Sequence, residues 1–532
     1  MTQTLLLAAA VITACVIFSK ISGKLGIPAL LAFIILGMFF GSDGIVKIEF
    51  DNYEFAEKIC STALIFIMFY GGFGTNWQQA KPIAARAVLL SSLGTVATAG
   101  LVGVFCRYVL NIAALESFLI GAVISSTDAA SVFSILRSKR LNLRDNTASL
   151  LELESGSNDP FSYMLTVIAL ALMNGEVSGG SFVYMLFSQL VFAVLFGALT
   201  AMFTMIFLKK VKPSASGFDA IFIVSAALAA YALPTALGGN GYLSVYITGI
   251  ILGNRRINNK QALVHFFDGA TALMQMLLFF LLGLLAFPSQ LPSVALTSLC
   301  IAVFLTFVAR PIAVFVLLSP FKSSLRQQLL VAWSGMRGAA SIVFAIMAVI
   351  NPAVTDNDIF HIVFFIVLFS ILLQGSLIPL AARKTGMTDP LADVMKTFND
   401  YIDKVPVQFI EFEISPSSPW SGKSVGEIVL PPDCILVLLM RGDEKTVPNG
   451  KTVLETGDKL ILSGRAAGEI EGVNLYEKQV GMDDEWSDKA VCDIPAGEKL
   501  IIMIKRSDDI IIPRGDTVLR ERDILVINDA GN

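Results

Sequence analysis

About thirteen stretches of mostly apolar residues follow one another through the first 385 residues of this chain, and no stretch of comparable length comes after them. A helix that crosses a bilayer needs roughly 20 mostly apolar residues, so each stretch is a candidate span. The whole chain is 55% hydrophobic and 15% charged, whereas soluble domains carry roughly 25% charged residues. The sequence therefore predicts an all-α membrane domain over residues 1–385. The predicted spans lie near 3–20, 28–47, 56–74, 83–106, 113–136, 149–173, 181–208, 218–233, 240–253, 266–287, 292–318, 327–350 and 358–381.

The basic residues of the connecting loops lie almost entirely in alternate loops. The odd-numbered loops hold Lys20, Lys24, Lys81, Arg86, Arg137, Lys139, Arg140, Arg144, Lys209, Lys210, Lys212, Arg255, Arg256, Lys260, Lys322 and Arg326. The even-numbered loops hold only Lys47, Lys58 and Arg107. Cytoplasmic loops of membrane proteins are enriched in Lys and Arg. The pattern predicts an N-terminus outside and a C-terminal region in the cytoplasm, in a multi-pass protein surrounded by membrane lipid.

An odd number of spans allows two halves of six helices, joined by a linker helix, to have opposite orientations in the membrane. This inverted-repeat plan is common among secondary transporters, whose binding sites are built from discontinuous helices. The fifth predicted span then corresponds to the twelfth. Polar residues and glycines interrupt both spans, at Ser125–Asp128 in the fifth and at Ser334–Gly338 in the twelfth. We therefore expect two discontinuous helices that cross within the membrane.

Two acidic residues lie at the depth of these interruptions. Asp159 follows a basic loop by about 13 residues, or roughly 20 Å of helix. Asp128 precedes the same loop by about nine residues, or roughly 14 Å. An ionisable side chain at membrane depth is costly and marks a candidate functional site. Because the two spans are antiparallel neighbours, we expect the two carboxylates to meet.

The sixth predicted span has a polar face. Ser155, Asp159 and Ser162 are spaced so that they share one side of a helix. Pro160 has no N–H to donate, which leaves the carbonyl of Gly156 without its helical partner. Carboxylate, hydroxyl and carbonyl oxygens are the ligands that a dehydrated alkali cation requires. The sequence therefore predicts a monovalent-cation site on this face.

The charges of this region suggest a mechanism. If Glu154 forms an ion pair with Arg337, that pair is neutral and structural, and Arg310, which precedes a proline, is interpreted as structural too. Asp159 then has no fixed cationic partner. Since burial disfavours an uncompensated charge, Asp159 would hold either a proton or a cation. Asn158 beside it cannot carry a second charge, so a one-for-one, electroneutral exchange is expected.

Two segments resemble the signature helices of the NhaP-type monovalent cation–proton antiporters, and more narrowly those of the bacterial potassium/proton branch. They are residues 125–136 (Ser-Ser-Thr-Asp-Ala-Ala-Ser-Val-Phe-Ser-Ile-Leu) and 152–160 (Glu-Leu-Glu-Ser-Gly-Ser-Asn-Asp-Pro). Asn240–Leu243 and Gly335–Ala339 add to the resemblance. Relatives often read Arg-Gly-Ala-Val-Pro where this chain reads Arg-Gly-Ala-Ala-Ser at 337–341, so the proline at the second interruption is missing.

The resemblance implies roles for individual residues. Asp159 would be the shared cation and proton site, and Thr127, Asp128 and Ser155 would help to bind the cation. Glu154 and Arg337 would be the stabilising ion pair. The resemblance also implies thirteen helices, a homodimer, transport by alternating access and a location in a bacterial inner membrane.

The last part of the chain contains an internal repeat. Arg441, Pro448, Gly450, Thr452–Leu454 and Asp458 recur 65 residues later as Arg506, Pro513, Gly515, Thr517–Leu519 and Asp523. Short apolar runs around these residues predict strands joined by turns. After a linker at 386–405, residues 406–470 resemble the RCK-C (TrkA-C) module, and residues 471–532 match it more loosely. The resemblance implies a regulatory α/β domain and a small nucleotide such as cyclic di-AMP as a candidate partner, with simple dimerisation as the alternative role.

A ligand-gated cation channel with an RCK-type sensor is the main alternative function. Such a channel would need a filter-like loop of carbonyls between spans, and the sequence has no run like Thr-Val-Gly-Tyr-Gly. An intramembrane hydrolase is a third class, but the antiporter-like context of Asp159 argues against an enzyme. Potassium is favoured over sodium by the resemblance alone, because both ions accept these ligands. We expect no cofactor, and the net charge of −4 gives no indication of nucleic acid.

Overall fold

The chain divides into two compact units, Met1–Lys404 and Val405–Asn532. The computed structural model describes residues 2–25, 29–75, 77–139, 141–175, 179–210, 217–255, 257, 260–353, 355–389, 407–416, 418–431, 434–442, 444–465, 475–481, 484–494, 499–506, 509–511 and 513–529. Most of the predicted linker at 386–405 lies outside these residues.

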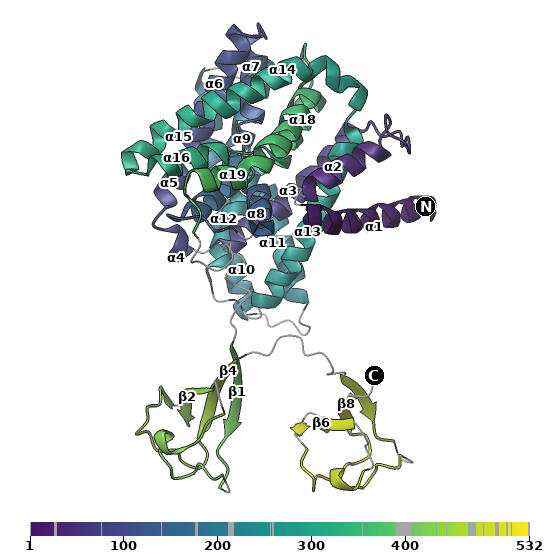
Figure 1. Cartoon of the computed structure of the whole chain (residues 1–532), viewed down its shortest axis with the longest axis vertical. Helices are drawn as coiled ribbons and strands as arrows, with labels where there is room; N and C mark the ends of the chain where they lie inside the picture. The colour runs from purple at the N-terminus through teal and green to yellow at the C-terminus, as the bar shows by residue number, and fades with distance from the viewer. Residues whose placement is uncertain are drawn as a thin grey trace. The chain divides into compact units, whose positions relative to one another are not determined.

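The first unit is a bundle of helices (Figure 1). Its first ten are α1 (Thr2–Leu25), α2 (Ala29–Phe40), α3 (Tyr53–Gly74), α4 (Trp77–Ala80), α5 (Ala84–Leu89), α6 (Thr95–Tyr108), α7 (Ala114–Val123), α8 (Ala129–Ser138), α9 (Thr147–Met173) and α10 (Gly179–Lys210). The others are α11 (Phe218–Thr235), α12 (Gly241–Gly253), α13 (Lys260–Leu285), α14 (Leu291–Phe304), α15 (Arg310–Leu318), α16 (Leu325–Trp333), α17 (Ala339–Ile350), α18 (Ile359–Phe369) and α19 (Ser376–Lys384).

Short turns of other helix types connect several of these elements. The π-helical turns η1 (Leu90–Gly94), η3 (Leu305–Ala309) and η5 (Ser370–Gly375) join α5 to α6, α14 to α15 and α18 to α19. The 3₁₀ turns η2 (Pro288–Gln290) and η4 (Ser319–Phe321) flank α14 and α15. Each of these three pairs of α-helices, together with the π turn that joins it, thus corresponds to a single predicted span.

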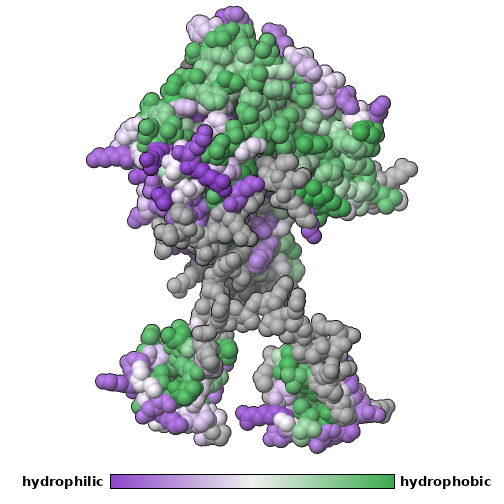
Figure 2. Space-filling view, in the orientation of Figure 1, coloured by the Kyte–Doolittle hydropathy of each residue, from purple (hydrophilic) through white to green (hydrophobic). Residues whose placement is uncertain are grey.

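The surface of this unit is suited to lipid. Among the described residues, seven helical stretches are long and apolar enough to cross a membrane, and five shorter helices are also apolar. Apolar residues cover most of the face of the unit seen in Figure 2, and large apolar side chains such as Val183, Phe187 and Val194 of α10 are exposed. The predicted all-α membrane fold is confirmed, whereas the number of thirteen spans stays a prediction.

Two of the predicted spans are broken, as the sequence indicated. The backbone is non-helical between α7 and α8 and again between α16 and α17. The two breaks touch: the N–H of Asp128 donates a hydrogen bond of 2.8 Å to the carbonyl of Met336. At Gly338, a Cβ atom would lie 2.5 Å from the Cβ of Asp128, so only glycine allows this approach. The second break forms without the proline that relatives often carry there.

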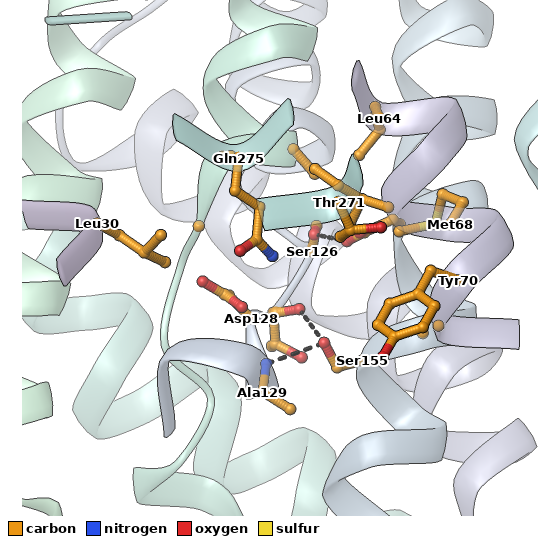
Figure 3. Close-up of a pocket in the computed structure, with 18 of the residues that line it drawn as sticks. Leu30, Leu64, Met68, Tyr70, Ser126, Asp128, Ala129, Ser155, Thr271 and Gln275 are labelled. Atoms are coloured by element: carbon orange, nitrogen blue, oxygen red, sulfur yellow. Dashed lines mark hydrogen bonds between the residues drawn. The ribbon is translucent and has the colours of Figure 1, made fainter. Parts of the chain in front are cut away.

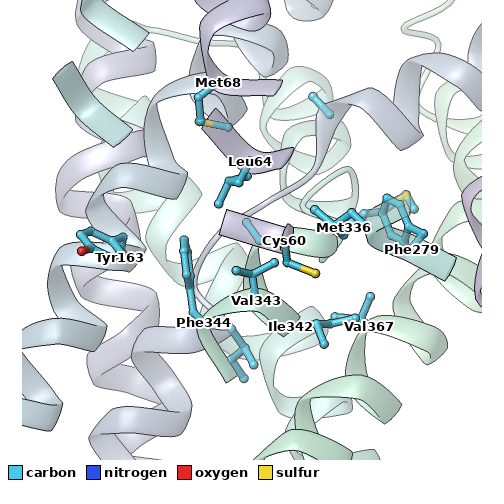
Figure 4. Packing of buried hydrophobic residues seen from close by; sticks show 14 of the residues in the cluster. Cys60, Leu64, Met68, Tyr163, Phe279, Met336, Ile342, Val343, Phe344 and Val367 are labelled. Atoms are coloured by element: carbon cyan, nitrogen blue, oxygen red, sulfur yellow. The ribbon is translucent and has the colours of Figure 1, made fainter. Parts of the chain in front are cut away.

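Buried apolar side chains fix α9 between its neighbours. Cys60 and Leu64 of α3 pack near Val343 and Phe344 of α17 (Figure 4). The ring of Phe344 lies 5.8 Å from the ring of Tyr163 in α9, measured between centroids. Interiors of this kind are close-packed and resist displacement of their elements. The polar face of α9 is therefore held in a defined position next to the two breaks.

The second unit contains two antiparallel four-stranded sheets. The first has the order β1-β4-β2-β3, with β1 (Val407–Glu413), β2 (Ile435–Arg441), β3 (Glu444–Thr446) and β4 (Lys459–Arg465). The second has the order β5-β8-β6-β7, with β5 (Leu475–Gln479), β6 (Lys499–Arg506), β7 (Asp509–Ile511) and β8 (Ile524–Asp529). The described residues of this unit add only the 3₁₀ turns η6 (Val425–Glu427) and η7 (Val491–Asp493) to these strands. The predicted α/β domain is thus a pair of β-sheets in the part that the structure describes, because its short apolar runs form strands.

Candidate functional site

A cavity of about 560 Å³ lies where the two breaks meet α9. Its walls come from the first break, the polar face of α9, the start of α17, and helices α2, α3 and α13 (Figure 3). The acidic residues that line it are Asp128, Glu152, Asp159 and Asp268, and no basic residue is among the described residues that line it. A cleft lined by one sign of charge raises the local concentration of the opposite ion. The cavity is therefore suited to a cation.

Asp159 lines this cavity, with 8% of its surface exposed. Its carboxylate accepts a hydrogen bond from the hydroxyl of Ser126 in the first break. Among the residues that the structure describes, no lysine, arginine or histidine forms an ion pair with it. A buried carboxylate in this situation needs a proton or a cation to be neutral.

Two more residues of α9 hold the first break in place. The hydroxyl of Ser155 donates to the carbonyl of Thr127 at 2.8 Å and accepts from the N–H of Ala129 at 2.9 Å. The amide of Asn158 donates to the hydroxyl of Thr127. Ser155 and Thr127 line the cavity, whereas Asn158 does not. Asn158, which was predicted to act at the cation site, contacts Thr127 and positions its hydroxyl in this structure.

Ser162 was predicted to bind the substrate, and in this structure it makes a different contact. Its side chain is fully buried, does not line the cavity, and donates a hydrogen bond of 2.7 Å to the carbonyl of Ala122. Ala122 belongs to the last turn of α7, and its carbonyl also accepts from the N–H and the hydroxyl of Ser125, at 3.3 and 2.7 Å. The polar stripe on α9 therefore has two kinds of contact: Ser155 and Asp159 line the cavity, and Ser162 bonds the end of the broken helix.

Asp128 occupies the start of α8. One of its oxygens accepts from the N–H of Ser131 at 3.3 Å, and the other accepts from the hydroxyl of the same residue. The N-terminus of a helix carries unpaired N–H groups and a partial positive charge, which favour a carboxylate there. The charge of Asp128 is thus partly compensated by α8, while its side chain still lines the cavity.

The ion pair of Glu154 differs from the prediction. Glu154 is buried and lies 2.6 Å from Nη2 of Arg310, rather than pairing with Arg337. Arg310 begins α15 and fits against Gly335 in the second break, where a Cβ atom would lie 2.6 Å from its Nε. The sequence contains two intramembrane arginines, Arg310 and Arg337, either of which could pair with Glu154. The packing of α15 against the second break makes Arg310 the partner.

Arg337 stabilises the first break by another route. Its Nη1 donates to the carbonyls of Ser125 and Ser126, at 2.8 and 2.7 Å. Its own N–H donates to the hydroxyl of Ser370 at 3.0 Å. Carbonyls at the C-terminal end of a helix carry partial negative charge, which a cation stabilises. Arg337, which is 1% exposed, therefore compensates the end of α7.

Sequence reasoning missed the wall formed by α3 and α13. Tyr70 of α3 donates a hydrogen bond of 3.1 Å to Asp268 of α13, and both line the cavity together with Thr271 and Gln275. Glu152 begins the signature segment 152–160 but was not assigned to the site, and it lines the cavity too. The spacing of Asp268, Thr271 and Gln275 places them on one side of a helix, the same kind of signal that identified the polar face of α9.

These groups define a class of protein. Carboxylate, hydroxyl and backbone carbonyl oxygens converge where two discontinuous helices cross, and such unwound segments bind ions in secondary transporters. The fold and the site together are those of an ion-transporting membrane protein.

Comparison with known proteins names the family. Residues 8–384 match the transmembrane sodium/hydrogen exchanger family, and residues 409–471 match the TrkA-C domain. The chain therefore belongs to the sodium/hydrogen exchanger family and carries a TrkA-C domain after its membrane unit. It is a transmembrane antiporter and not an enzyme, which agrees with the family suggested by its motifs.

Individual relatives agree with this assignment. The K(+)/H(+) antiporter NhaP of Alkalimonas amylolytica is 32% identical over 464 residues, which cover 86% of this chain and 80% of that protein. The K(+)/H(+) antiporter NhaP2 of Shewanella oneidensis is 32% identical over 485 residues, covering 90% and 84%. The solved structure of the sodium proton antiporter MjNhaP1 from Methanocaldococcus jannaschii at pH 8 has a TM-score of 0.63 at 24% identity, covers 72% of this chain and 99% of its own, and supports the fold.

Proposed function

We propose that this protein exchanges potassium for protons, one for one, at Asp159. The observation that carries the proposal is the position of Asp159: a nearly buried carboxylate, without a cationic partner among the described residues, that lines an acidic cavity. A cation reaching this carboxylate displaces its proton, and a returning proton displaces the cation. Thr127, Asp128 and Ser155 supply the further oxygens that replace water around the ion.

A second cavity supports alternating access. It has a volume of about 510 Å³ and is lined by Glu57 of α3, by Val167 and Asn174 of α9, and by Asn351 after α17, among others. Val167 is eight residues, or about 12 Å of helix, beyond Asp159. The two cavities therefore lie toward opposite ends of α9. A displacement of α9 and the two breaks that closes the first cavity and connects Asp159 with the second would carry the ion across.

The test is ion exchange by the full chain reconstituted in liposomes, followed with a pH-sensitive dye. Wild-type protein is expected to release protons from acid-loaded vesicles when potassium is added, with a smaller response to sodium. Asp159→Asn keeps the size and the hydrogen-bond acceptor of the side chain but cannot exchange a charge, so exchange should vanish. Exchange that persists in this variant, or unitary currents typical of a channel, would contradict the proposal.

Electroneutrality follows from the single exchangeable carboxylate and is tested separately. If one proton replaces one potassium ion, a membrane potential should not change the exchange rate. The potential is set with a chloride gradient and a chloride carrier, without valinomycin. Asp128→Asn is the matched comparison for Asp159→Asn, because the charge of Asp128 is compensated by the N-terminus of α8. Exchange that accelerates with voltage would mean that a second carboxylate takes part.

The preference for potassium, the orientation and the assembly belong to this proposal as well. The relatives named above as K(+)/H(+) antiporters support potassium, and the basic loops support a cytoplasmic tail in a bacterial inner membrane. We infer a homodimer from the family resemblance. Cross-linking in membranes and protease access to the tail from either side test these points.

We also propose that the tail regulates exchange, with a small nucleotide such as cyclic di-AMP as the candidate ligand. The match to the TrkA-C domain over 409–471 supports a regulatory role. Removing the tail from residue 400 onward should leave exchange intact and change its activation by pH or ligand. If the activation profile is unchanged, the tail serves only for assembly.

A further inference from the structure

The cavity has a second polar wall, which the proposed exchange at Asp159 does not use. It is formed by α13, where Asp268, Thr271 and Gln275 follow one another at spacings of three and four residues and all line the cavity. Such spacings place side chains on one face of a helix. Phe279 continues the same face as an apolar residue. The polar part of the wall is therefore limited to three side chains that face the first break and α9.

Thr271 is the residue that indicates a ligand. It is 6% exposed, and its hydroxyl has no hydrogen-bond partner in the structure. Buried hydroxyl groups are usually paired, and an unpaired one costs free energy unless something binds it. Most threonines in helices bond a carbonyl of the preceding turn, as Thr166 and Thr248 do here. The hydroxyl of Thr271 bonds no such carbonyl, and the residue lines the cavity.

The neighbours of Thr271 suit a cation. Asp268 is exposed at one end of the stripe and is oriented by the hydrogen bond from Tyr70. Gln275 at the other end extends its amide toward Asp128 in Figure 3. A carboxylate, a hydroxyl and an amide oxygen are hard oxygen ligands, and no basic residue lies among the described residues that line the cavity.

We propose that Asp268, Thr271 and Gln275 form a second subsite for a monovalent cation, which holds the ion before it reaches Asp159. Asp268 attracts the hydrated ion, and the oxygens of Thr271 and Gln275 replace part of its water. Loss of water in two stages lowers the barrier to binding in the confined space beside Asp159, and the size of the subsite contributes to the choice between potassium and sodium. This role in transport rests on the exchange proposed above.

The first test measures exchange kinetics. Thr271→Val has the same shape and breaks no hydrogen bond, so the fold should be unchanged. Removing one ligand of an ion should raise the apparent KM for potassium by about tenfold, with Vmax retained and the potassium-to-sodium ratio altered. Asp268→Asn, which can still accept from Tyr70, should also raise KM. Ser298→Ala is the matched control, because Ser298 is a fully buried, unpaired hydroxyl on α14 away from the cavity.

The second test does not depend on exchange. Equilibrium binding of radioactive rubidium to the purified full chain should reveal two classes of site. Asp159→Asn should leave about one ion bound per chain, and adding Thr271→Val and Asp268→Asn should remove it. The subsite is disproved if Asp159→Asn already abolishes rubidium binding, or if KM and ion preference are unchanged in both α13 variants while Asp159→Asn stops exchange. A wild type that binds two ions without exchanging them would instead contradict the exchange mechanism alone.

Discussion

Both units of the molecule contain a repeated element. The repeat in the membrane unit and the repeat in the tail differ in how their charged residues are paired. In the membrane unit, the two broken segments carry opposite charges: Asp128 lies in the first break and Arg337 in the second. In the tail, the two sheets carry the same pair. Arg441 bonds Asp458 at 2.8 Å in the first sheet, and Arg506 bonds Asp523 at 2.7 Å in the second.

The environment explains this difference. In the membrane, charge that is not compensated nearby is costly, so one break supplies the charge that the other needs. Arg337 of the second break donates hydrogen bonds to carbonyls of the first break. The two breaks therefore have different roles. In the tail, each sheet has its own buried aspartate and must satisfy it locally. Only the exposed surroundings differ: Glu455 also bonds Arg441 at 2.8 Å, whereas Arg520 stands at the corresponding position of the second sheet.

The largest expected effect concerns the ion pair between Glu154 and Arg310. Arg310→Met leaves the carboxylate of Glu154 buried without a partner, which should lower the free energy of unfolding by about 3–5 kcal/mol. The double variant with Glu154→Gln removes both charges and should recover most of that loss. Thermal unfolding of the purified protein in detergent measures both effects.

The same measurement tests the choice of partner. Arg337→Met should also destabilise the protein, because two carbonyls at the end of α7 lose their donor. Glu154→Gln should not rescue this variant. If Glu154→Gln rescues Arg337→Met and fails to rescue Arg310→Met, the pairing predicted from the sequence is the correct one.

An intermediate effect is expected where the two breaks touch. Gly338→Ala places a methyl group 2.5 Å from the Cβ of Asp128, and overpacking of this kind costs about 1–3 kcal/mol. Because the strain falls on the cavity, the exchange rate should fall as well. Gly71→Ala is the control: Gly71 also lines the cavity, but a Cβ there meets nothing within 4 Å. Equal exchange rates in the two variants would show that the contact between the breaks is not needed for transport.

Much of the membrane unit could be predicted because its signals are local. The polar and glycine-rich interruptions at Ser125–Asp128 and Ser334–Gly338 indicated the two breaks, and an acid at membrane depth indicated Asp159. The three π turns could not be predicted, since nothing in the apolar runs around η1, η3 and η5 distinguishes them from regular helix. The strands of the tail followed from short apolar runs and the 65-residue repeat.

The parts of the site that were missed depend on contacts between distant segments. Glu154 and Arg310 are 156 positions apart, and only the packing of α15 against Gly335 brings them together. Ser162 shares a helical face with Asp159, but periodicity does not say how far the cavity extends along that face. Asp268 lies near the start of its predicted span, and its partner Tyr70 looks like an ordinary apolar-span residue until α3 and α13 are placed side by side.

The smallest expected effect is a loss of stability of the two tail sheets at acid pH. The hydrogen bond from Arg441 lowers the pKa of Asp458. In the second sheet burial alone would raise the pKa of Asp523, but the bond from Arg506 leaves it lowered. A carboxyl whose pKa is lowered by folding stabilises the fold above its unfolded pKa of about 3.9, and this contribution is lost as the pH falls through the folded value. Hydrogen-exchange protection of β2 and β4, and of β6 and β8, should therefore fall together below about pH 4, with Arg441→Met removing this dependence from the first sheet only. A second sheet that also loses its pH dependence in that variant would show that the two repeats are coupled rather than independently stabilised.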